Sequence, residues 1–411
     1  MKSIDSNKDN VQKAGPYRVM VVDDSAVIRG FICRYLTEDA DIEIACTAAN
    51  GKMALAQMKD HDIEVVVLDI EMPVMDGMTA LPLLLKEKPD LKVVMASTLT
   101  LKNAEVSLRA MQMGAVDYVP KPETARSVNS SIDFRRDLVD KVKAWAGRAR
   151  TKKGIAQPEK IDTSRAATQS GFVKPAARAT TSFVRPDSTA KATDRINKVR
   201  EAIKSKEPAK ITLQRPSMRK PSILAVGSST GGPQALMKFF KGFSKAPAVP
   251  IVITQHMPAT FTGILAQHLG QASGWPSKEA EDGDILQAGH IYVAPGDFHL
   301  TIHMEAGQLV AHLNQDPQEN FCRPSVEPML RSLHKIFKER VLTVILTGMG
   351  HDGLKAARDL VKTGATLLAQ DEETSVVWGM PGAVATAGLC SFVMPIDKLS
   401  KQAEIQLQGG L

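Results

Sequence analysis

Short apolar runs alternate with longer amphipathic segments in the first third of the chain. The runs predict five buried strands: Tyr17–Val22, Ile42–Ala48, Val65–Leu68, Lys92–Ala96 and Ala115–Val119. Segments with helical spacing separate them: Ser25–Glu38, Gly51–Lys59, Gly77–Lys88 and Asn103–Met113. Five strand–helix repeats of this kind predict an α/β domain with a doubly wound parallel sheet.

The same alternation resumes at Ser222 and predicts a second α/β domain. Its expected strands are Ile223–Gly227, Ile251–Thr254, His290–Ala294, Leu300–His303, Val341–Leu346, Ala365–Ala369 and Phe392–Met394. Its expected helices are Pro233–Phe240, Phe261–Gly270, Val326–Phe337, His351–Lys362 and Met380–Ala387. The strands between His290 and Val310 follow one another closely, which predicts an antiparallel hairpin in an otherwise mostly parallel, doubly wound domain.

Four regions follow from these patterns. Residues 1–15 are polar and are expected to be disordered, and residues 16–135 form the first domain. Residues 136–220 begin within a helix, Phe134–Arg150, that leads into a long flexible linker of Lys, Arg, Ala, Ser, Thr and Pro. A short helix is expected within it, at Asp194–Lys206. Residues 221–405 form the second domain.

Charge and cysteine content narrow the class of protein. The chain carries a net charge of +7, but residues 146–220 hold 19 Lys and Arg against 6 Asp and Glu, so the predicted domains are net acidic. The four cysteines are scattered without a CxxC pair, which argues against a disulfide framework or a zinc site. No apolar run reaches the roughly 18 residues of a membrane span, and the polar N-terminus lacks a signal-peptide core. A cytoplasmic protein without membrane insertion is expected.

Polar residues follow the predicted strands of the first domain. Asp23 and Asp24 come after the first strand, Asp69 after the third, Ser97 after the fourth and Lys121 after the fifth. Because the carboxyl ends of parallel strands meet at one edge, three carboxylates converge there, and Mg²⁺ suits such oxygen ligands. The competing interpretation is that the first two acids only cap a helix and the third is an ordinary loop acid.

These positions resemble the response-regulator receiver family, whose fold is a flavodoxin-like (βα)5 sheet. The resemblance covers about residues 17–135 and is carried by the segments Val21–Ser25, Leu68–Pro73, Met75–Gly77, Ala96–Thr98 and Tyr118–Pro122. It implies that Asp69 accepts a phosphoryl group and that Asp23, Asp24, Asp69 and the backbone carbonyl of Glu71 bind Mg²⁺. It also implies that Ser97 and Tyr118 are switch residues and that Lys121 contacts the phosphoryl group.

The second domain opens with a candidate nucleophile. Gly227-Ser228-Ser229-Thr230-Gly231 follows an apolar strand and precedes a helix, which is the context that Gly-x-Ser-x-Gly requires. The frame selects Ser229, although its neighbour Ser228 also carries a hydroxyl. A phosphate-binding loop or a simple helix cap remains an alternative for this motif alone. The absence of Gly-Lys-Ser/Thr argues against a nucleotide-hydrolysing loop.

A serine nucleophile needs a base and an orienting acid. His256 follows the strand Ile251–Thr254, and Asp352 lies in a glycine-rich turn after the strand Val341–Leu346, so both are expected at the edge that holds Ser229. His290 starts a strand and is expected at the opposite edge. His351 is a competing base, and His299 stays open as a candidate.

These segments resemble the catalytic domain of the CheB family, the protein-glutamate methylesterases of bacterial chemotaxis. The resemblance covers about residues 222–400 and is carried by Val226–Pro233, Thr254–Pro258, Val293–Gly296, Arg323–Val326, Leu346–Gly353 and Gln370–Pro381. It implies that Ser229 is the nucleophile, His256 the base and Asp352 the orienting acid. It also implies that Thr230 and Met349 form the rim and oxyanion contacts. Ser228 stands where the family often has Ala.

Together the two resemblances imply a phosphorylation-activated hydrolase. It would demethylate glutamate methyl esters on methyl-accepting chemotaxis receptors, with glutamine deamidation as a second activity. A chemotaxis histidine kinase would be the phosphodonor, and no cofactor is expected in the catalytic domain. One alternative is a receiver-controlled signalling or binding protein that serves a receptor of a related pathway. A DNA-binding regulator is the other, but no helix-turn-helix signature is visible and the basic charge lies in the linker, so no nucleic-acid partner is expected.

Overall fold

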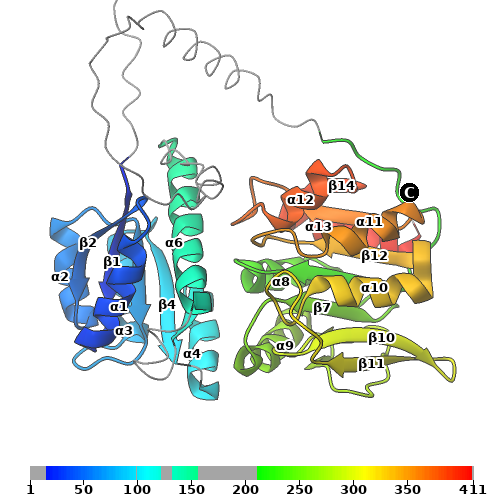
Figure 1. Cartoon of the computed structure of the whole chain (residues 1–411), viewed down its shortest axis with the longest axis horizontal. Helices are drawn as coiled ribbons and strands as arrows, with labels where there is room; N and C mark the ends of the chain where they lie inside the picture. The colour runs from blue at the N-terminus through cyan, green and yellow to red at the C-terminus, as the bar shows by residue number, and fades with distance from the viewer. Residues whose placement is uncertain (1–14, 99, 122–131, 156–210, 410–411) are drawn as a thin grey trace, which may run out of the picture. The chain divides into compact units, whose positions relative to one another are not determined.

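The structure is a computed structural model that describes residues 15–98, 100–121, 132–155 and 211–409. Two α/β domains are formed by these residues (Figure 1). The predicted N-terminal disorder, the predicted helix Asp194–Lys206 and most of the predicted linker lie outside them. No helix in the described ranges is long and apolar enough to cross a membrane.

The first domain contains the predicted five-stranded sheet, with the strand order β2-β1-β3-β4-β5 and parallel pairing throughout. Its strands are β1 (Tyr17–Val22), β2 (Ile42–Ala48), β3 (Val65–Asp69), β4 (Lys92–Thr98) and β5 (Asp117–Lys121). Its helices are α1 (Ala26–Thr37), α2 (Gly51–Asp60), α3 (Gly77–Glu87), α4 (Leu101–Gln112) and α6 (Ile132–Lys153). The doubly wound receiver-type fold predicted from the sequence is confirmed.

Side-chain alternation along β1 shows how this sheet is covered on both faces. Val19 and Val21 belong to one apolar cluster, whereas Met20 and Val22 belong to the other. The first cluster includes side chains of α1 and α6, and the second includes side chains of α2, α3 and α4. Because both faces are buried, the strands are nearly continuous apolar runs.

The second domain contains a seven-stranded parallel sheet with the order β14-β13-β12-β6-β7-β9-β8. Its strands are β6 (Ile223–Ser228), β7 (Ile251–Gln255), β8 (Ser277–Glu279), β9 (Ile291–Val293), β12 (Val341–Ile345), β13 (Thr366–Gln370) and β14 (Phe392–Met394). The chain begins at β6, builds the sheet to one side through β7, and then crosses to the other side at β12. The connections that lead to the two neighbours of β6 therefore run to opposite sides of it. α/β proteins place ligands at the carboxyl end of the strand where this happens.

Helices cover this sheet as well. They are α8 (Gly232–Lys241), α9 (Ala259–Ser273), α10 (Val326–Phe337), α11 (Leu354–Lys362), α12 (Met380–Thr386) and α13 (Ile396–Gln408), with a short 3-10 turn at Lys338–Arg340. In α8, Leu236, Phe239 and Phe240 are buried at helical spacing against the sheet. The sequence analysis did not anticipate β8 or α13. The expected helix His351–Lys362 starts only at Leu354, because residues 351–353 form a turn ending in left-handed Gly353.

The predicted antiparallel hairpin is confirmed, but its location was wrong. It is formed by β10 (His299–Glu305) and β11 (Gln308–Asn314), whereas β9 pairs in parallel with β7 in the main sheet. The turn after β9 separates it from β10, and the tight turn at Ala306 and Gly307, both with positive φ, makes β10 and β11 the partners. The hairpin packs on α10, where the Ile302 amide donates to the Ser332 hydroxyl.

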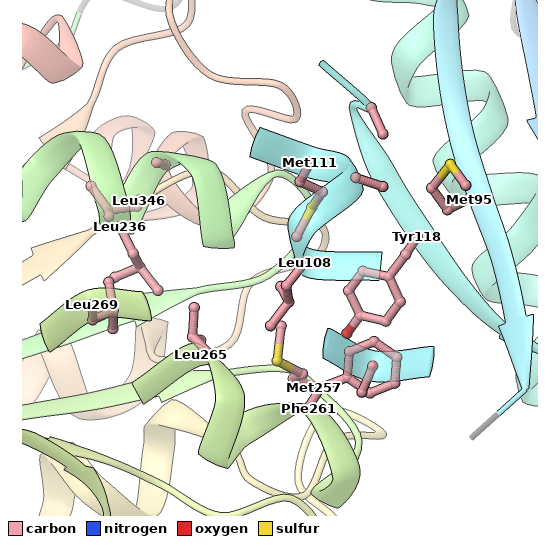
Figure 2. Packing of buried hydrophobic residues seen from close by; sticks show 14 of the residues in the cluster. Met95, Leu108, Met111, Tyr118, Leu236, Met257, Phe261, Leu265, Leu269 and Leu346 are labelled. Carbon is pink, nitrogen blue, oxygen red and sulfur yellow. The ribbon is translucent and has the colours of Figure 1, made fainter. Parts of the chain in front are cut away.

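One buried apolar cluster contains side chains of both domains (Figure 2). Leu108 and Met111 of α4 and Tyr118 of β5 belong to it, together with Phe261 and Leu265 of α9. The rings of Tyr118 and Phe261 stack with their centroids 4.3 Å apart. Such a ring pair contributes about 0.5–1.5 kcal/mol beyond its buried area, so Tyr118 is part of a packed apolar contact.

Candidate active site

The candidate site lies at the carboxyl end of β6, between the loops that follow β7 and β12. The amide of Ser229 donates to the Thr347 carbonyl over 3.0 Å, and the amide of His256 donates to the Ser228 carbonyl over 3.1 Å. These two bonds attach the serine turn to both neighbouring strands. The predicted convergence of these segments at one edge of the sheet thus follows directly from the strand order.

The two adjacent serines occupy different environments. Ser228 is fully buried, and its hydroxyl donates to Oε1 of Gln255 over 2.7 Å. The Gln255 amide nitrogen donates in turn to the carbonyls of Ser229 and His256, each over 3.0 Å. Ser229 is only half-buried. The Ser228 hydroxyl is therefore committed to holding the loop, and the Ser229 hydroxyl is the more accessible of the two.

Glycines allow the serine turn to pack tightly. Gly231 has a left-handed φ of 73° before α8. At Gly232 a Cβ would lie 1.9 Å from Oε1 of Gln255, and at Gly348 a Cβ would lie 2.8 Å from that of Ser229. A side chain at either position would displace the serine or the glutamine that supports it.

The predicted rim residues also lie at this edge. The Thr230 carbonyl accepts a hydrogen bond from the Thr347 hydroxyl over 3.0 Å, and Thr230 itself is buried. Met349 is half-buried in the loop that follows β12. The N-terminus of α8 lies directly behind Ser229, and the helix dipole there favours negative charge.

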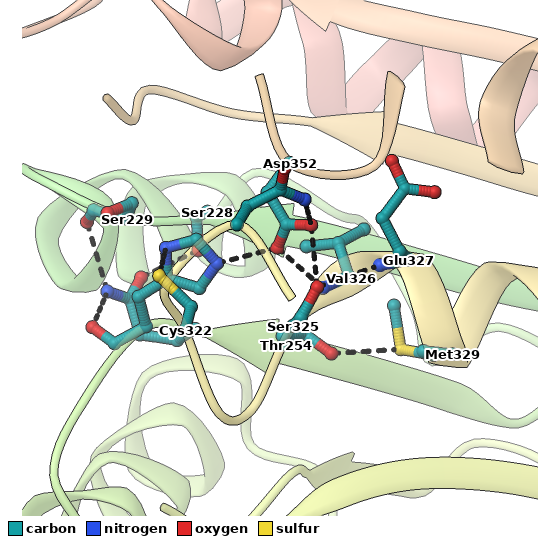
Figure 3. A network of polar contacts seen from close by, with 12 residues as sticks. Ser228, Ser229, Thr254, Cys322, Ser325, Val326, Glu327, Met329 and Asp352 are labelled. Atoms are coloured by element: carbon teal, nitrogen blue, oxygen red, sulfur yellow. Dashed lines mark hydrogen bonds and ion pairs between the residues drawn. The ribbon is translucent and has the colours of Figure 1, made fainter. Parts of the chain in front are cut away.

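His256 and Asp352 form the central polar contact of the site. Nε2 of His256 lies 2.7 Å from Oδ2 of Asp352. The Asp352 carboxylate also accepts from the Val326 amide at 2.7 Å, the Ser325 hydroxyl at 2.6 Å and the Asn320 amide at 2.8 Å (Figure 3). Four donors thus saturate a carboxylate that is only 2% exposed. Asp352 is held as a buried anion with one fixed orientation.

The pKa values of this pair move in opposite directions. Burial alone would raise the pKa of Asp352, but the hydrogen bonds and charge of His256, with the donors Ser325 and Val326, lower it to about 2. Burial would lower the pKa of His256, but the interactions with Cys322 and Asp352 raise it to about 10. The site therefore stabilises an imidazolium beside a carboxylate, the charge state that forms when a histidine accepts a proton.

The turn carrying Asp352 is positioned by α10. Glu327, which is 1% exposed, accepts hydrogen bonds from the amides of Lys355 and Ala356 and so caps the start of α11. Burial raises the pKa of Glu327, whereas these two amides oppose that shift. A Cβ at Gly227 would lie only 2.8 Å from the side chain of Val326, so Val326 packs directly against the backbone of β6. The helix pair α10–α11 thereby fixes the carboxylate against β6.

The other candidate histidines lie outside this contact. His290 precedes β9, where its Nδ1 contacts the Ala288 carbonyl, and His351 is exposed. His299 is buried, with Nε2 beside the Pro317 carbonyl and Nδ1 accepting from the Ser325 amide. His299 therefore supports the loop that holds Asp352.

The sequence analysis assigned no role to three residues that the structure brings to the site. Asn320 and Ser325 bind Asp352, and the thiol of Cys322 lies 3.3 Å from Nδ1 of His256. All three come from the loop between β11 and α10, which follows no strand of the main sheet. The segment Arg323–Val326, which carries part of the family resemblance, was the only sequence signal for this loop.

A second polar cluster lies at the carboxyl edge of the receiver-type sheet. Carboxylate oxygens of Asp23, Asp24 and Asp69 lie within 4.8 Å of one another. Nζ of Lys121 lies 3.0 Å from Asp23 and 2.7 Å from Asp69. Burial raises the pKa of Asp69 to about 6, with Asp23 adding to the shift and Lys121 opposing it. Crowding three carboxylates around one ammonium leaves excess negative charge, which suits a divalent cation.

The remaining receiver candidates are more dispersed. Ser97 is buried at the end of β4, and its hydroxyl lies 2.9 Å from that of Ser107 on α4. The ring of Tyr118 stacks on that of Phe261 (Figure 2). The Glu71 side chain is mostly exposed and lies 3.9 Å from Lys102.

Comparison with known proteins relates both halves of the chain to described families. Residues 19–133 match the response regulator receiver domain model, and residues 224–403 match the CheB methylesterase model. A protein-glutamate methylesterase/protein-glutamine glutaminase of Rhodospirillum rubrum is 49% identical over 388 residues, covering 94% of each chain. One from Azospirillum brasilense is 46% identical, covering 93% of this chain and 91% of its own.

Solved structures match each half separately. The catalytic domain of Thermotoga maritima CheB methylesterase is 40% identical and is covered to 98%, over 45% of this chain, with a TM-score of 0.44. The response regulator domain of Thermotoga maritima CheB is 31% identical and is covered to 97%, over 32% of this chain, with a TM-score of 0.28.

Asp352→Asn tests whether the buried carboxylate stabilises the fold. The lowered pKa corresponds to about 2–3 kcal/mol of stability at pH 7. Because the pKa is lower in the folded state, this stability is present above pH 3.8 and is lost as the pH falls towards 2. Urea unfolding should show the variant less stable by about that amount at neutral pH, with the difference shrinking below about pH 4.

Asp359→Asn is the matched control, because this acid is 57% exposed and forms an ion pair with Lys362 on the surface of α11. Its stability should change by less than about 0.5 kcal/mol. A deficit in Asp352→Asn that stays constant between pH 7 and pH 3 would contradict the assignment.

Proposed function

The chain belongs to the CheB methylesterase family and is a chemotaxis methylesterase with a receiver domain, and on that premise we propose how it works. Ser229, His256 and Asp352 hydrolyse glutamyl methyl esters on methyl-accepting chemotaxis receptors. Phosphorylation of Asp69 by a chemotaxis histidine kinase activates the hydrolysis. The observation that carries the catalytic part is the His256–Asp352 contact of 2.7 Å beside the serine turn.

In the proposal, one ring nitrogen of His256 carries the proton transfers. Because Nε2 is bonded to Asp352, Nδ1 would accept the proton of Ser229. Ser229 then attacks the γ-carbonyl carbon of the ester, and Asp352 stabilises the imidazolium that results. His256 returns the proton to the departing methanol. A water molecule, deprotonated by the same nitrogen, hydrolyses the acyl-enzyme to glutamate.

The negative oxygen that forms on the ester carbonyl needs hydrogen-bond donors. Backbone amides near Thr230 and Met349, with the N-terminus of α8 behind them, supply these donors in the proposal. One such donor is worth about 3 kcal/mol in serine hydrolases. Gly348 keeps this space open, because its missing side chain would contact both Ser229 and Met380.

Deamidation of receptor glutamines is a second proposed activity. Relatives 46–49% identical are named both methylesterases and glutaminases. A primary amide presents the same carbonyl to Ser229, and ammonia replaces methanol as the group that His256 protonates.

The acidic edge of the receiver domain fits a magnesium ion. Asp23, Asp24 and Asp69 would hold it, together with the backbone carbonyl of Glu71. When bound, the ion would neutralise charge on the phosphoryl oxygens transferred to Asp69. Lys121, which already contacts Asp23 and Asp69, supplies the second positive charge at this edge.

The contacts of β5 support a route from Asp69 to the catalytic edge. Lys121 contacts Asp69, and Tyr118 lies three residues earlier on the same strand. Tyr118 stacks on Phe261 of α9, the helix that begins just after the loop carrying His256. A phosphoryl group on Asp69 that draws Lys121 inward would alter the packing of Tyr118 on α9. We propose that this releases the receiver from the catalytic edge.

Replacing each adjacent serine separately tests the nucleophile. Ser229→Ala should lower methanol release from methylated receptor fragments by at least about 10⁴-fold, as expected when a triad loses its nucleophile. Ser228→Ala is the matched control: it removes only the bond to Gln255, so activity should fall far less. Circular dichroism checks that both variants fold. A larger loss in Ser228→Ala would show that the frame is wrong.

Replacing the phosphoacceptor tests the regulation. Acetyl phosphate with Mg²⁺ should raise methanol release several-fold in the wild type and leave Asp69→Asn at the unphosphorylated rate. Asp90→Asn serves as the control, because this acid is 70% exposed and pairs with Lys153. Activity of Asp69→Asn equal to that of the phosphorylated wild type would refute control through this residue.

A further inference from the structure

Cys322 occupies a position that the reaction above does not use. Its Sγ lies 3.3 Å from Nδ1 of His256, and Nε2 of the same ring lies 2.7 Å from Asp352. Thiol, imidazole and carboxylate therefore form a continuous chain of contacts (Figure 3). Such a chain is the arrangement by which cysteine nucleophiles are activated, since the imidazole can take the thiol proton and the carboxylate can stabilise the resulting imidazolium.

The other three cysteines lie in environments that keep them as thiols. Burial raises the pKa of Cys33 and of Cys46, in each case against a smaller opposing effect of an arginine. Burial raises the pKa of Cys390 to about 12. None of these three contacts a histidine in the hydrogen bonds found among the described residues. Cys322 differs from them because an imidazole with its own carboxylate partner lies beside it.

Cys322 lies near the protein surface and not in the core. Cys322 is half-buried, and it follows Phe321, which is 76% exposed. The loop is short and hydrogen-bonded, with the amide of Cys322 donating to the Glu319 carbonyl and the amide of Glu319 donating back. The sulfur is thus held beside the imidazole on a defined turn at the surface of the catalytic edge.

We propose that Cys322 is a modification site for small hydroperoxides, and that its oxidation reversibly switches off the esterase. The inhibition rests on the proposed use of His256 as the base. In the proposed reaction, Nδ1 of His256 accepts the proton of Ser229. The sulfenic acid on Cys322 would donate a hydrogen bond to that nitrogen and so make it unavailable to Ser229. A small neutral peroxide suits a half-buried thiol, and the adjacent imidazolium provides the acid that its leaving group needs.

The chemistry balances with a peroxide as the only co-reactant. The thiol proton moves to Nδ1 of His256, and the thiolate attacks one oxygen of hydrogen peroxide. The sulfur–oxygen bond forms as the oxygen–oxygen bond breaks, and the departing hydroxide takes the proton from His256 to give water. The sulfur loses two electrons and becomes a sulfenic acid, and the peroxide gains them. A dithiol such as dithiothreitol returns the thiol, forming its own disulfide and water.

Peroxide inhibition of the full-length protein tests the switch. Wild type, Cys322→Ser and a Cys33→Ser/Cys46→Ser double variant are treated with hydrogen peroxide, and methanol release is compared with each protein's own untreated rate. Wild type and the double variant should lose at least about tenfold (a factor equivalent to 1.4 kcal/mol) and recover with dithiothreitol, whereas Cys322→Ser should keep its rate. Dimedone, which traps sulfenic acids, should label Cys322. Equal inhibition of Cys322→Ser would overturn the proposal.

Alkylation rates provide a test that does not depend on esterase activity. Iodoacetamide labelling, followed peptide by peptide with mass spectrometry, should modify Cys322 faster than Cys33 and Cys46, and His256→Gln should abolish that advantage. Labelling of Cys322 no faster than of Cys33 would refute the activated thiol, whatever the esterase does. Fast, His256-dependent labelling in a protein that releases no methanol would support the thiol and reject the proposed esterase instead.

Discussion

The catalytic edge depends on one buried carboxylate. Asp352 accepts hydrogen bonds from His256, Val326, Ser325 and Asn320, and it thereby joins three segments that are distant in the sequence. Removing one partner from a buried charged contact is strongly destabilising, so these segments are not free to move independently. The orientation of the imidazole, and with it the proposed use of Nδ1 as the reactive nitrogen, follows from this one group.

Both domains place their chemistry by the same topological rule. In each sheet the first strand of the domain lies between two later strands, one on either side. β1 lies between β2 and β3, and β6 lies between β7 and β12. The connections that lead to these neighbours therefore run in opposite directions. Asp23 and Ser229 follow these two strands. One domain gathers carboxylates at this point and the other gathers a hydroxyl and an imidazole, so the fold fixes the place of the site and the loops determine its chemistry.

Sequence patterns predicted the site residues that follow parallel strands. They predicted few of the site residues that lie in other loops. Asp69 and His256 could be placed because each follows a buried apolar strand, and strand ends converge. Cys322 and Asn320 could not, because they lie in a loop after a hairpin, where no periodicity relates sequence position to the sheet. The hairpin itself was predicted with the wrong strand, since Ile291–Val293 is as apolar as a hairpin strand and only pairing in three dimensions assigns it to the main sheet. The polar helix α13 was missed for a related reason, because its weakly apolar face is evident only once it packs on the sheet.

The sequence separation within the site links catalysis to the order of folding. His256 and Asp352 are 96 residues apart, and β6 pairs with β12 only after the hairpin and α10 have been synthesised. Contacts of such separation form late, because the closure of a long loop must be compensated before they stabilise the chain. On the ribosome, a growing chain that already contains the serine turn and His256 still lacks Asp352, which orients the imidazole. The proposed hydrolytic edge is therefore assembled only in a domain that has completed its sheet.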